Sequence, residues 1–384
     1  MTFHFATATQ IHFGAGALRE AGSIARRFGR RALIVTGKTV ERARPLLELL
    51  DACGVSSITF PVAGEPTLSK IVGGSQLCRM EQCDFVIGFG GGSAIDAGKA
   101  ISALTTNDGE LLDYLEVVGA GKPLEQPTLP FIAIPTTTGT GAEVTRNAVL
   151  SSPEHRVKVS LRSSLMLPKF ALVDPVLTYD LPSDLTASTG LDALTQLVEA
   201  YVSCRANPLT DAICVEGIRR AAKSLRGACD NGADPTARED MALASLFGGL
   251  ALANAGLGAV HGFAAAIGGM FTAPHGAVCA ALLPHVMQAN IVALRERDRD
   301  AAFLHRYDEV ARLLAGSPTA GDSEGVAWVE QLCAHLKIPS LQCYGITRND
   351  FLEVIEKASQ SSSMRANPIV LNEGEMEQIL QRAL

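Results

Sequence analysis

The sequence lacks the features that mark secreted, membrane and disulfide-stapled proteins. Its nine cysteines are an odd number and form no C-x-x-C pair, which argues against a disulfide framework or a cysteine-based zinc site. No stretch of about 20 residues is free of polar groups. The N-terminal residues do not form a basic segment followed by an apolar one. We therefore expect a cytoplasmic protein that does not associate with a membrane.

The sequence is also short of aromatic residues and of positive charge. It contains one Trp, five Tyr and 14 Phe, too few for the aromatic platforms that bind single-stranded nucleic acid. The 33 Lys and Arg residues are outnumbered by 40 Asp and Glu residues, giving a net charge of −7, and basic residues occur only in short clusters. Nucleic acid is therefore not expected as a partner.

Apolar residues, by contrast, are abundant and follow two different patterns. They make up 47% of the 384 residues, enough for two or three domains with large cores. From Arg31 onward, short apolar runs alternate with helix-length segments, as in β-α-β units around a largely parallel sheet. After about Leu181, Ala- and Leu-rich segments of helical spacing dominate. We predict an α/β N-terminal domain over residues 1–180 and an all-helical C-terminal domain over residues 181–384. The apolar runs are 32–35, 57–60, 84–87, 131–134 and 171–173.

Two glycine-bearing loops follow predicted strands. The run 84–87 leads into Gly88-Phe-Gly90-Gly91-Gly92-Ser93-Ala-Ile-Asp96, a glycine turn that feeds a helix and lets the backbone approach a pyrophosphate. Ser93 and Asp96 have the spacing of a capping box, which predicts the start of that helix. The run 131–134 leads into Pro135 and the loop 136–145, rich in Thr hydroxyls that suit phosphate and ribose oxygens. Each loop alone is also compatible with a turn that binds nothing, but together they indicate one nucleotide between them.

Three acidic or amide side chains and two histidines in the helical half are candidates for a metal site. Asp192, Gln196 and Glu199 occur at i, i+4 and i+7, on one face of a predicted helix. His261 and His275 stand beside small residues in apolar surroundings. An Asp and two His brought together suit a divalent ion such as Zn or Fe. Spacing alone does not join these residues, and each one taken singly is also compatible with a structural role.

The motifs together resemble the iron-containing, or group III, alcohol dehydrogenase family over nearly the whole chain. The resemblance implies an NAD(P)-binding α/β domain, a helical metal domain of dehydroquinate synthase-like architecture, and a homodimer. It implies an enzyme that interconverts an alcohol and its aldehyde or ketone by hydride transfer to or from NAD or NADP, with a divalent metal polarising the substrate oxygen. The matching motifs are Phe13-Gly14-Ala-Gly16, Gly90-Gly-Gly-Ser93-Ala-Ile-Asp96, Ile134-Pro-Thr-Thr137, Gly139-Thr-Gly-Ala-Glu143-Val-Thr145, Asp174-Pro175, Gly190-Leu-Asp-Ala-Leu-Thr195, Pro274-His-Gly276 and Asn367-Pro368.

The resemblance also assigns roles by position. The metal ligands it implies are Asp192, Gln196, His261 and His275, of which Gln196 and His275 are also the candidate catalytic residues. The cofactor-binding residues it implies are Gly37, Gly91, Gly92, Ser93, Asp96, Thr136, Thr137, Thr140, Val149, Lys158 and Leu185.

The chain departs from the family pattern at two positions near the metal. Gln196 stands where the family normally has a His, and a neutral amide oxygen is a weaker donor than imidazole toward Zn or Fe(II). Ala265 stands where many members carry another His that serves a proton path. We expect the metal affinity to be reduced because of Gln196, and the proton path to be changed because of Ala265.

Three alternatives to the metal-dependent enzyme remain open on the sequence. The first is a metal-independent reductase of the maleylacetate reductase kind, in which Gln196 and His275 donate hydrogen bonds to the substrate carbonyl. The others are a sugar-phosphate cyclase-type lyase and a nucleotide-binding protein without turnover. The choice between NAD and NADP is also open, because Gly37 and Lys38 tolerate a 2′-phosphate whereas Glu65 disfavours it.

Overall fold

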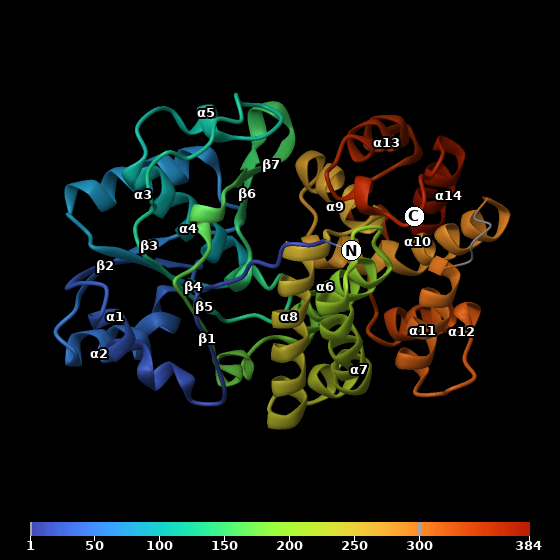
Figure 1. The fold of residues 1–384 in the computed structure, drawn as a ribbon, viewed down its shortest axis with the longest axis horizontal. Coiled ribbons are helices and arrows are strands. Elements are labelled where there is room, and N and C mark those ends of the chain that lie inside the picture. Colours follow the sequence, from blue (N-terminus) through green and yellow to red (C-terminus); the bar gives the residue numbers. More distant parts are fainter. Residues whose placement is uncertain (1, 298–301) are drawn as a thin grey trace. The chain divides into compact units, whose positions relative to one another are not determined.

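The computed structural model describes residues 2–297 and 302–384, which fold into two compact units (Figure 1). An α/β unit comprises Ala6–Thr137 and Gly141–Tyr179. A helical unit comprises Asp180–Leu384 outside the four undescribed residues, and it also contains residues 2–5 and Thr138–Thr140. The sequence analysis placed Thr138–Thr140 in the first domain, whereas in the structure these three residues group with the helical unit and the rest of their loop groups with the α/β unit.

The α/β unit is built on a parallel sheet with the strand order β1-β8-β5-β4-β2-β3. All five predicted apolar runs overlap its strands, so the predicted parallel α/β fold is confirmed. The strand β1 and an antiparallel hairpin, β6 with β7, were not predicted from the sequence. The strands are β1 (Ile11–Phe13), β2 (Arg31–Thr36), β3 (Ser56–Pro61), β4 (Phe85–Gly90), β5 (Phe131–Pro135), β6 (Asn147–Ser152), β7 (Val157–Arg162) and β8 (Phe170–Val173).

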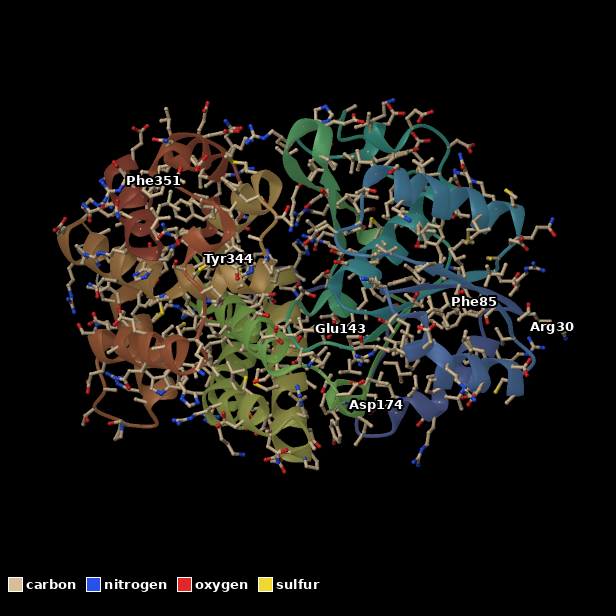
Figure 2. The ribbon with its side chains drawn as sticks, turned by 180° about the vertical axis from the view of Figure 1, so that it is seen from behind. Arg30, Phe85, Glu143, Asp174, Tyr344 and Phe351 are labelled. Atoms are coloured by element: carbon tan, nitrogen blue, oxygen red, sulfur yellow. The ribbon has the colours of Figure 1, made fainter. Side chains whose placement is uncertain are left out.

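Both faces of this sheet are covered, which explains the continuous apolar runs. Leu33 on β2 belongs to a core that includes Ile101 of α4. Its neighbour Ile34 belongs to a second core with Leu46 of α2, because successive side chains of a strand point to opposite faces. Phe85, labelled in Figure 2, lies in this second core. The helices of the unit are α1 (Ala21–Arg26), α2 (Arg44–Ala52), α3 (Leu68–Met80), α4 (Gly92–Thr106) and α5 (Leu111–Tyr114).

Asp174 fixes the first strand to the rest of the sheet. It follows β8 directly, and its carboxylate accepts backbone hydrogen bonds from Gly16 and Leu18 at 3.0 Å each (Figure 2). It also accepts one from Val176, two residues on, at 3.0 Å. The Asp174-Pro175 motif therefore closes the turn after β1.

The helical unit has one extensive apolar core, formed by the inward faces of its helices. Helices α6, α7 and α8 pack against one another, as Figure 1 shows. Helix α10 is long and apolar enough to cross a membrane, but 72% of its most apolar window is buried inside the protein, as expected of a core helix. The helices are α6 (Ser183–Val202), α7 (Pro208–Asp230), α8 (Pro235–Ala255), α9 (Ala259–Met270), α10 (His275–Arg297), α11 (Ala302–Ala315), α12 (Asp322–His335), α13 (Phe351–Ser359) and α14 (Glu373–Ala383).

Candidate active site

The strand order places the glycine turn where a nucleotide is expected. The chain passes from β2 outward to the edge strand β3, then returns to the other side of β2 and continues outward through β4 and β5. The connections after β2 and β4 therefore diverge, and ligands of open α/β sheets bind at such a point, beyond the carboxyl ends of the strands. Gly37 follows β2, and Gly91 and Gly92 follow β4. The predicted cofactor-binding residues Gly37, Gly91 and Gly92 thus lie at the same edge of the sheet.

The glycine turn after β4 lies close to Gly37 and to the Thr-rich loop because its glycines have no side chains. A Cβ atom at Gly90 would lie 2.7 Å from the Cβ atom of Ala94 and 3.3 Å from the backbone nitrogen of Gly37, closer than a well-packed side chain allows. A Cβ atom at Gly91 would lie 3.3 Å from Oγ1 of Thr137, in the neighbouring Thr-rich loop. The backbone N–H of Thr136 donates to the carbonyl of Gly90 at 2.9 Å. The structure therefore brings together the glycine turn and the start of the Thr-rich loop.

The predicted capping box at Ser93 is wrong. Helix α4 begins at Gly92 with Gly91 as its N-cap, and no side chain caps it, so Ser93 lies within the first turn. Asp96 instead accepts a hydrogen bond from the backbone N–H of Val149 on β6 at 3.0 Å and pairs with Lys99 at 3.0 Å. The spacing fitted a capping box, but the glycine turn ends earlier and Asp96 attaches the hairpin to α4.

The remaining predicted cofactor residues fall into both units. Val149 lies on β6 and Lys158 on β7, where the Lys158 ammonium group pairs with Glu65 Oε1 at 2.8 Å. Thr140 and Leu185 belong to the helical unit. Assignment of these positions to the cofactor stays a prediction.

Three of the four predicted metal ligands come together inside the helical unit. Asp192 lies on α6, His261 on α9 and His275 at the first position of α10. Nε2 of His261 lies 3.3 Å from Asp192 Oδ1, and Nε2 of His275 lies 3.7 Å from the same oxygen. Asp192 and His261 are buried, whereas the His275 side chain is 30% exposed. The three side chains thus converge on one point, and of the three only His275 is partly exposed.

A glycine allows α10 to start against α6. A Cβ atom at Gly276 would lie 2.3 Å from the carbonyl oxygen of Ser188 and 3.3 Å from Cβ of Asp192. Any larger residue would push α10 away from α6, so the Pro274-His275-Gly276 motif combines a ligand with the residue that lets it approach Asp192.

Glu199 orients His261, a role that the sequence analysis did not assign. Its Oε2 lies 2.6 Å from Nδ1 of His261, and its Oε1 accepts the backbone N–H of Val260 at 2.7 Å. A carboxylate can only accept, so Nδ1 carries a proton and Nε2 faces Asp192. A carboxylate behind a ligating imidazole is a common arrangement in metal sites. The signal in the sequence was its i+7 position from Asp192.

We predict that Glu199→Gln weakens metal binding by about 10- to 100-fold, because loss of the carboxylate frees the ring orientation and lowers the basicity of Nε2. Competition with a chromophoric chelator measures this affinity. Glu239→Gln on the exposed face of α8 is the control and leaves the affinity unchanged. Equal affinities of Glu199→Gln and the wild type would contradict the role of Glu199.

The sequence analysis also missed Cys279. It lies one helical turn after His275 on α10, is fully buried, and its Sγ lies 3.8 Å from Nε2 of His261 and 3.7 Å from Nε2 of His275. The available signal was the i+4 spacing from His275. One donor atom from each of Asp192, His261, His275 and Cys279 lies within 4.8 Å of the others.

Gln196 lies on α6, one helical turn after Asp192. Its buried Oε1 has no hydrogen-bond partner among the described residues. This oxygen lies 3.0 Å from the position that a Cβ atom would take at Gly248 on α8. Its role as a ligand or as a catalytic donor stays a prediction. Ala265, one turn after His261 on α9, offers no proton-transferring group.

The electrostatics of the cluster suit a cation. Oδ1 of Asp192 is buried and makes no hydrogen bond within the described residues. Burial raises the pKa of Asp192, but His275 and His261 outweigh burial and hold the pKa below its usual value. Burial lowers the pKa of His261, but Cys279, Asp192 and Glu199 outweigh it and the pKa lies well above its usual value. A buried carboxylate beside two imidazoles is a donor set that fits Zn or Fe(II).

Comparison with known proteins agrees with this geometry. The family model described as iron-containing alcohol dehydrogenase matches residues 8–175, and the model of the C-terminal part of Fe-containing alcohol dehydrogenases matches residues 186–384. The chain is 37% identical to the 1,3-propanediol dehydrogenase of Klebsiella pneumoniae over 92% of each chain. It is 36% identical to alcohol dehydrogenase 4 of Schizosaccharomyces pombe, covering 97% of this chain and 87% of that protein.

Solved structures give the same result for the fold. A 1,3-propanediol oxidoreductase superposes with a TM-score of 0.92 at 34% identity, over 100% of both chains. The alcohol dehydrogenase of Oenococcus oeni superposes with a TM-score of 0.91 at 33% identity, again over 100% of both chains. The resemblance stated from the motifs is therefore confirmed. The chain belongs to the iron-containing alcohol dehydrogenase family and is an oxidoreductase that interconverts alcohols with aldehydes or ketones.

Proposed function

We propose that this enzyme uses NAD and a divalent metal, Fe or Zn, held by Asp192, His261 and His275, to interconvert a small alcohol and its aldehyde. The observation that carries the metal is the convergence of one buried carboxylate oxygen and two imidazole Nε2 atoms within 3.7 Å of that oxygen. A small alcohol is supported by relatives named for 1,3-propanediol, and by a relative from Bacillus methanolicus named NAD-dependent methanol dehydrogenase at 33% identity.

The residues of the chain divide the work between binding and orientation. When bound, the metal supplies a Lewis acid for the substrate oxygen, and the nicotinamide carries the hydride. Glu199 fixes the tautomer and direction of His261. Gly276 holds His275 against α6. The glycine turn after β4 presents backbone N–H groups to the pyrophosphate.

NAD is favoured over NADP by the charge at the sheet edge. Glu65 follows β3, the strand that pairs with β2, and Gly37 follows β2, so both lie at the carboxyl edge of adjacent strands. A carboxylate there bonds ribose hydroxyls and repels a 2′-phosphate. Lys158 pairs with Glu65 at 2.8 Å and offsets part of this repulsion, so the preference for NAD is expected to be partial.

A metal-independent reductase is the second candidate, in which the side-chain N–H of Gln196 and His275 would donate hydrogen bonds to a substrate carbonyl. The buried Oε1 of Gln196 has no partner among the described residues and can only accept, so it favours a cation over this candidate. The cyclase-type lyase is not supported, because both matching family models are those of dehydrogenases.

The proposal also includes a homodimer located in the cytoplasm. The nine free cysteines support a reducing compartment.

Metal analysis combined with chelation separates the two candidates. We predict near-stoichiometric Fe or Zn by elemental mass spectrometry, loss of at least about 100-fold in alcohol oxidation after chelation, and recovery when Zn or Fe(II) is added. Repeating the assay with NADP in place of NAD tests the cofactor preference. Full activity of a metal-free, chelator-resistant protein would overturn the metal-dependent mechanism and favour hydrogen-bond polarisation by Gln196 and His275.

A further inference from the structure

Cys279 lies in the candidate metal site but in none of the motifs that carry the family resemblance. We propose that the Cys279 thiolate is the fourth protein ligand of the bound metal, in place of the oxygen of Gln196. This inference rests on the proposed function, because it requires that the site binds a metal. Four donors from α6, α9 and α10 then form the site: one carboxylate oxygen, two imidazole nitrogens and one sulfur.

The distances between donor atoms match a coordination shell. With a metal–sulfur bond of about 2.3 Å and a metal–nitrogen bond of about 2.05 Å, a tetrahedral ion has a sulfur–nitrogen edge of about 3.6 Å. Cys279 Sγ lies 3.8 Å and 3.7 Å from the two Nε2 atoms. The corresponding nitrogen–oxygen edge is about 3.4 Å, and Asp192 Oδ1 lies 3.3 Å and 3.7 Å from the same nitrogens.

The surroundings and the chemistry of Cys279 point the same way. The thiol is fully buried and its sulfur faces both imidazoles, so no solvent competes for it. A thiolate is also an anionic donor, whereas an amide oxygen is neutral and weak toward Zn or Fe(II). The sulfur therefore compensates for the imidazole that the chain lacks at position 196.

Metal binding through the Cys279 sulfur releases one proton and selects among divalent ions. The metal–sulfur bond forms as the S–H bond breaks, and the thiol proton leaves to solvent without any change of oxidation state. A site with one sulfur favours Zn, Fe(II) and Co(II) over the oxygen-preferring ions Mg and Mn.

Cobalt substitution tests the sulfur ligand without relying on activity. The full chain is freed of metal by chelation and titrated with Co(II). We expect an intense near-ultraviolet sulfur-to-Co(II) charge-transfer band at one equivalent. In Cys279→Ser this band disappears, and Zn affinity measured by chelator competition falls by at least about 100-fold. Cys214→Ser, a buried thiol of α7, is the matched control and retains both the band and the affinity. Gln196→Ala changes the Zn affinity less than Cys279→Ser does.

The wild-type Co(II) spectrum tests the sulfur ligand on its own, so the test holds even where a variant fails to fold. A wild type that binds one Co(II) without the charge-transfer band overturns the sulfur ligand but leaves the proposed metal-dependent function intact. A wild type that binds no divalent metal overturns both. Equal Zn affinity of Cys279→Ser and the wild type also overturns the sulfur ligand.

Discussion

Asp192→Asn is expected to leave the enzyme nearly free of metal and to lower kcat by about 10²- to 10³-fold, the loss seen when one preorganised electrostatic group is removed from an active site. Asp192 is the only carboxylate among the four clustered donors. Its Oδ1 has no hydrogen-bond partner in the described part of the chain, so a bound cation is what this buried oxygen is placed to meet. A neutral amide keeps the shape but loses the charge that attracts a divalent ion.

Three measurements check this expectation: metal content by elemental mass spectrometry, kcat, and NADH binding by fluorescence. NADH binding stays close to that of the wild type, because the glycine turn belongs to the α/β unit and Asp192 to the helical unit. Asp230→Asn, at an exposed position of α7, is the matched control and retains metal and activity. An Asp192→Asn variant with unchanged kcat would show that the buried carboxylate does not support turnover through a metal.

Much of the α/β unit could be predicted because its signals are local. Short apolar runs marked the main strands, and the glycine turn after 84–87 marked the start of a helix. The strand β1 was missed because it has only three residues, and its position depends on the distant Asp174 carboxylate. The capping-box error has a similar origin, since the true partner of Asp96 is the backbone of Val149, 53 residues away.

The metal cluster was only partly predictable because three helices build it. The motifs identified Asp192, His261 and His275, and the structure brings them together. Nothing in the spacing says that α9 and α10 direct both imidazoles toward Cys279, since this depends on how closely α10 approaches α6 at Gly276. Glu199 was on the predicted face of α6, but its partner lies 62 residues further along the chain.

A second large effect concerns folding stability rather than turnover, and it arises at Glu143 (Figure 2). Glu143 lies in the short 3-10 helix Ala142–Val144, and only 2% of it is exposed. Burial raises its pKa from 4.5 to about 7. Its own backbone N–H and the charge of Lys99 oppose this rise only in part. Lys99 is already engaged, because its ammonium group pairs with Asp96 at 3.0 Å and donates to Thr145 Oγ1 at 2.9 Å.

The raised pKa sets the direction of the pH dependence. Below about pH 4.5 Glu143 is protonated in both the folded and the unfolded chain, so it contributes no pH-dependent cost. Between about pH 4.5 and pH 7 the unfolded chain ionises first, and the free energy of unfolding falls as pH rises. Above pH 7 the cost is constant at about 3 kcal/mol, since each pKa unit corresponds to about 1.4 kcal/mol.

We therefore expect Glu143→Gln to be more stable than the wild type by up to about 3 kcal/mol at pH 8, with the difference vanishing near pH 4.5. Urea unfolding of the metal-free, cofactor-free protein at a series of pH values measures it. Glu125→Gln, at an exposed position of the same unit, is the control and shows no pH-dependent gain. If Glu143→Gln gave the same difference at every pH, the carboxyl would titrate alike in the folded and unfolded chains. Its burial would then carry no electrostatic cost, and the stabilisation would have to come from packing or hydrogen bonding of the amide.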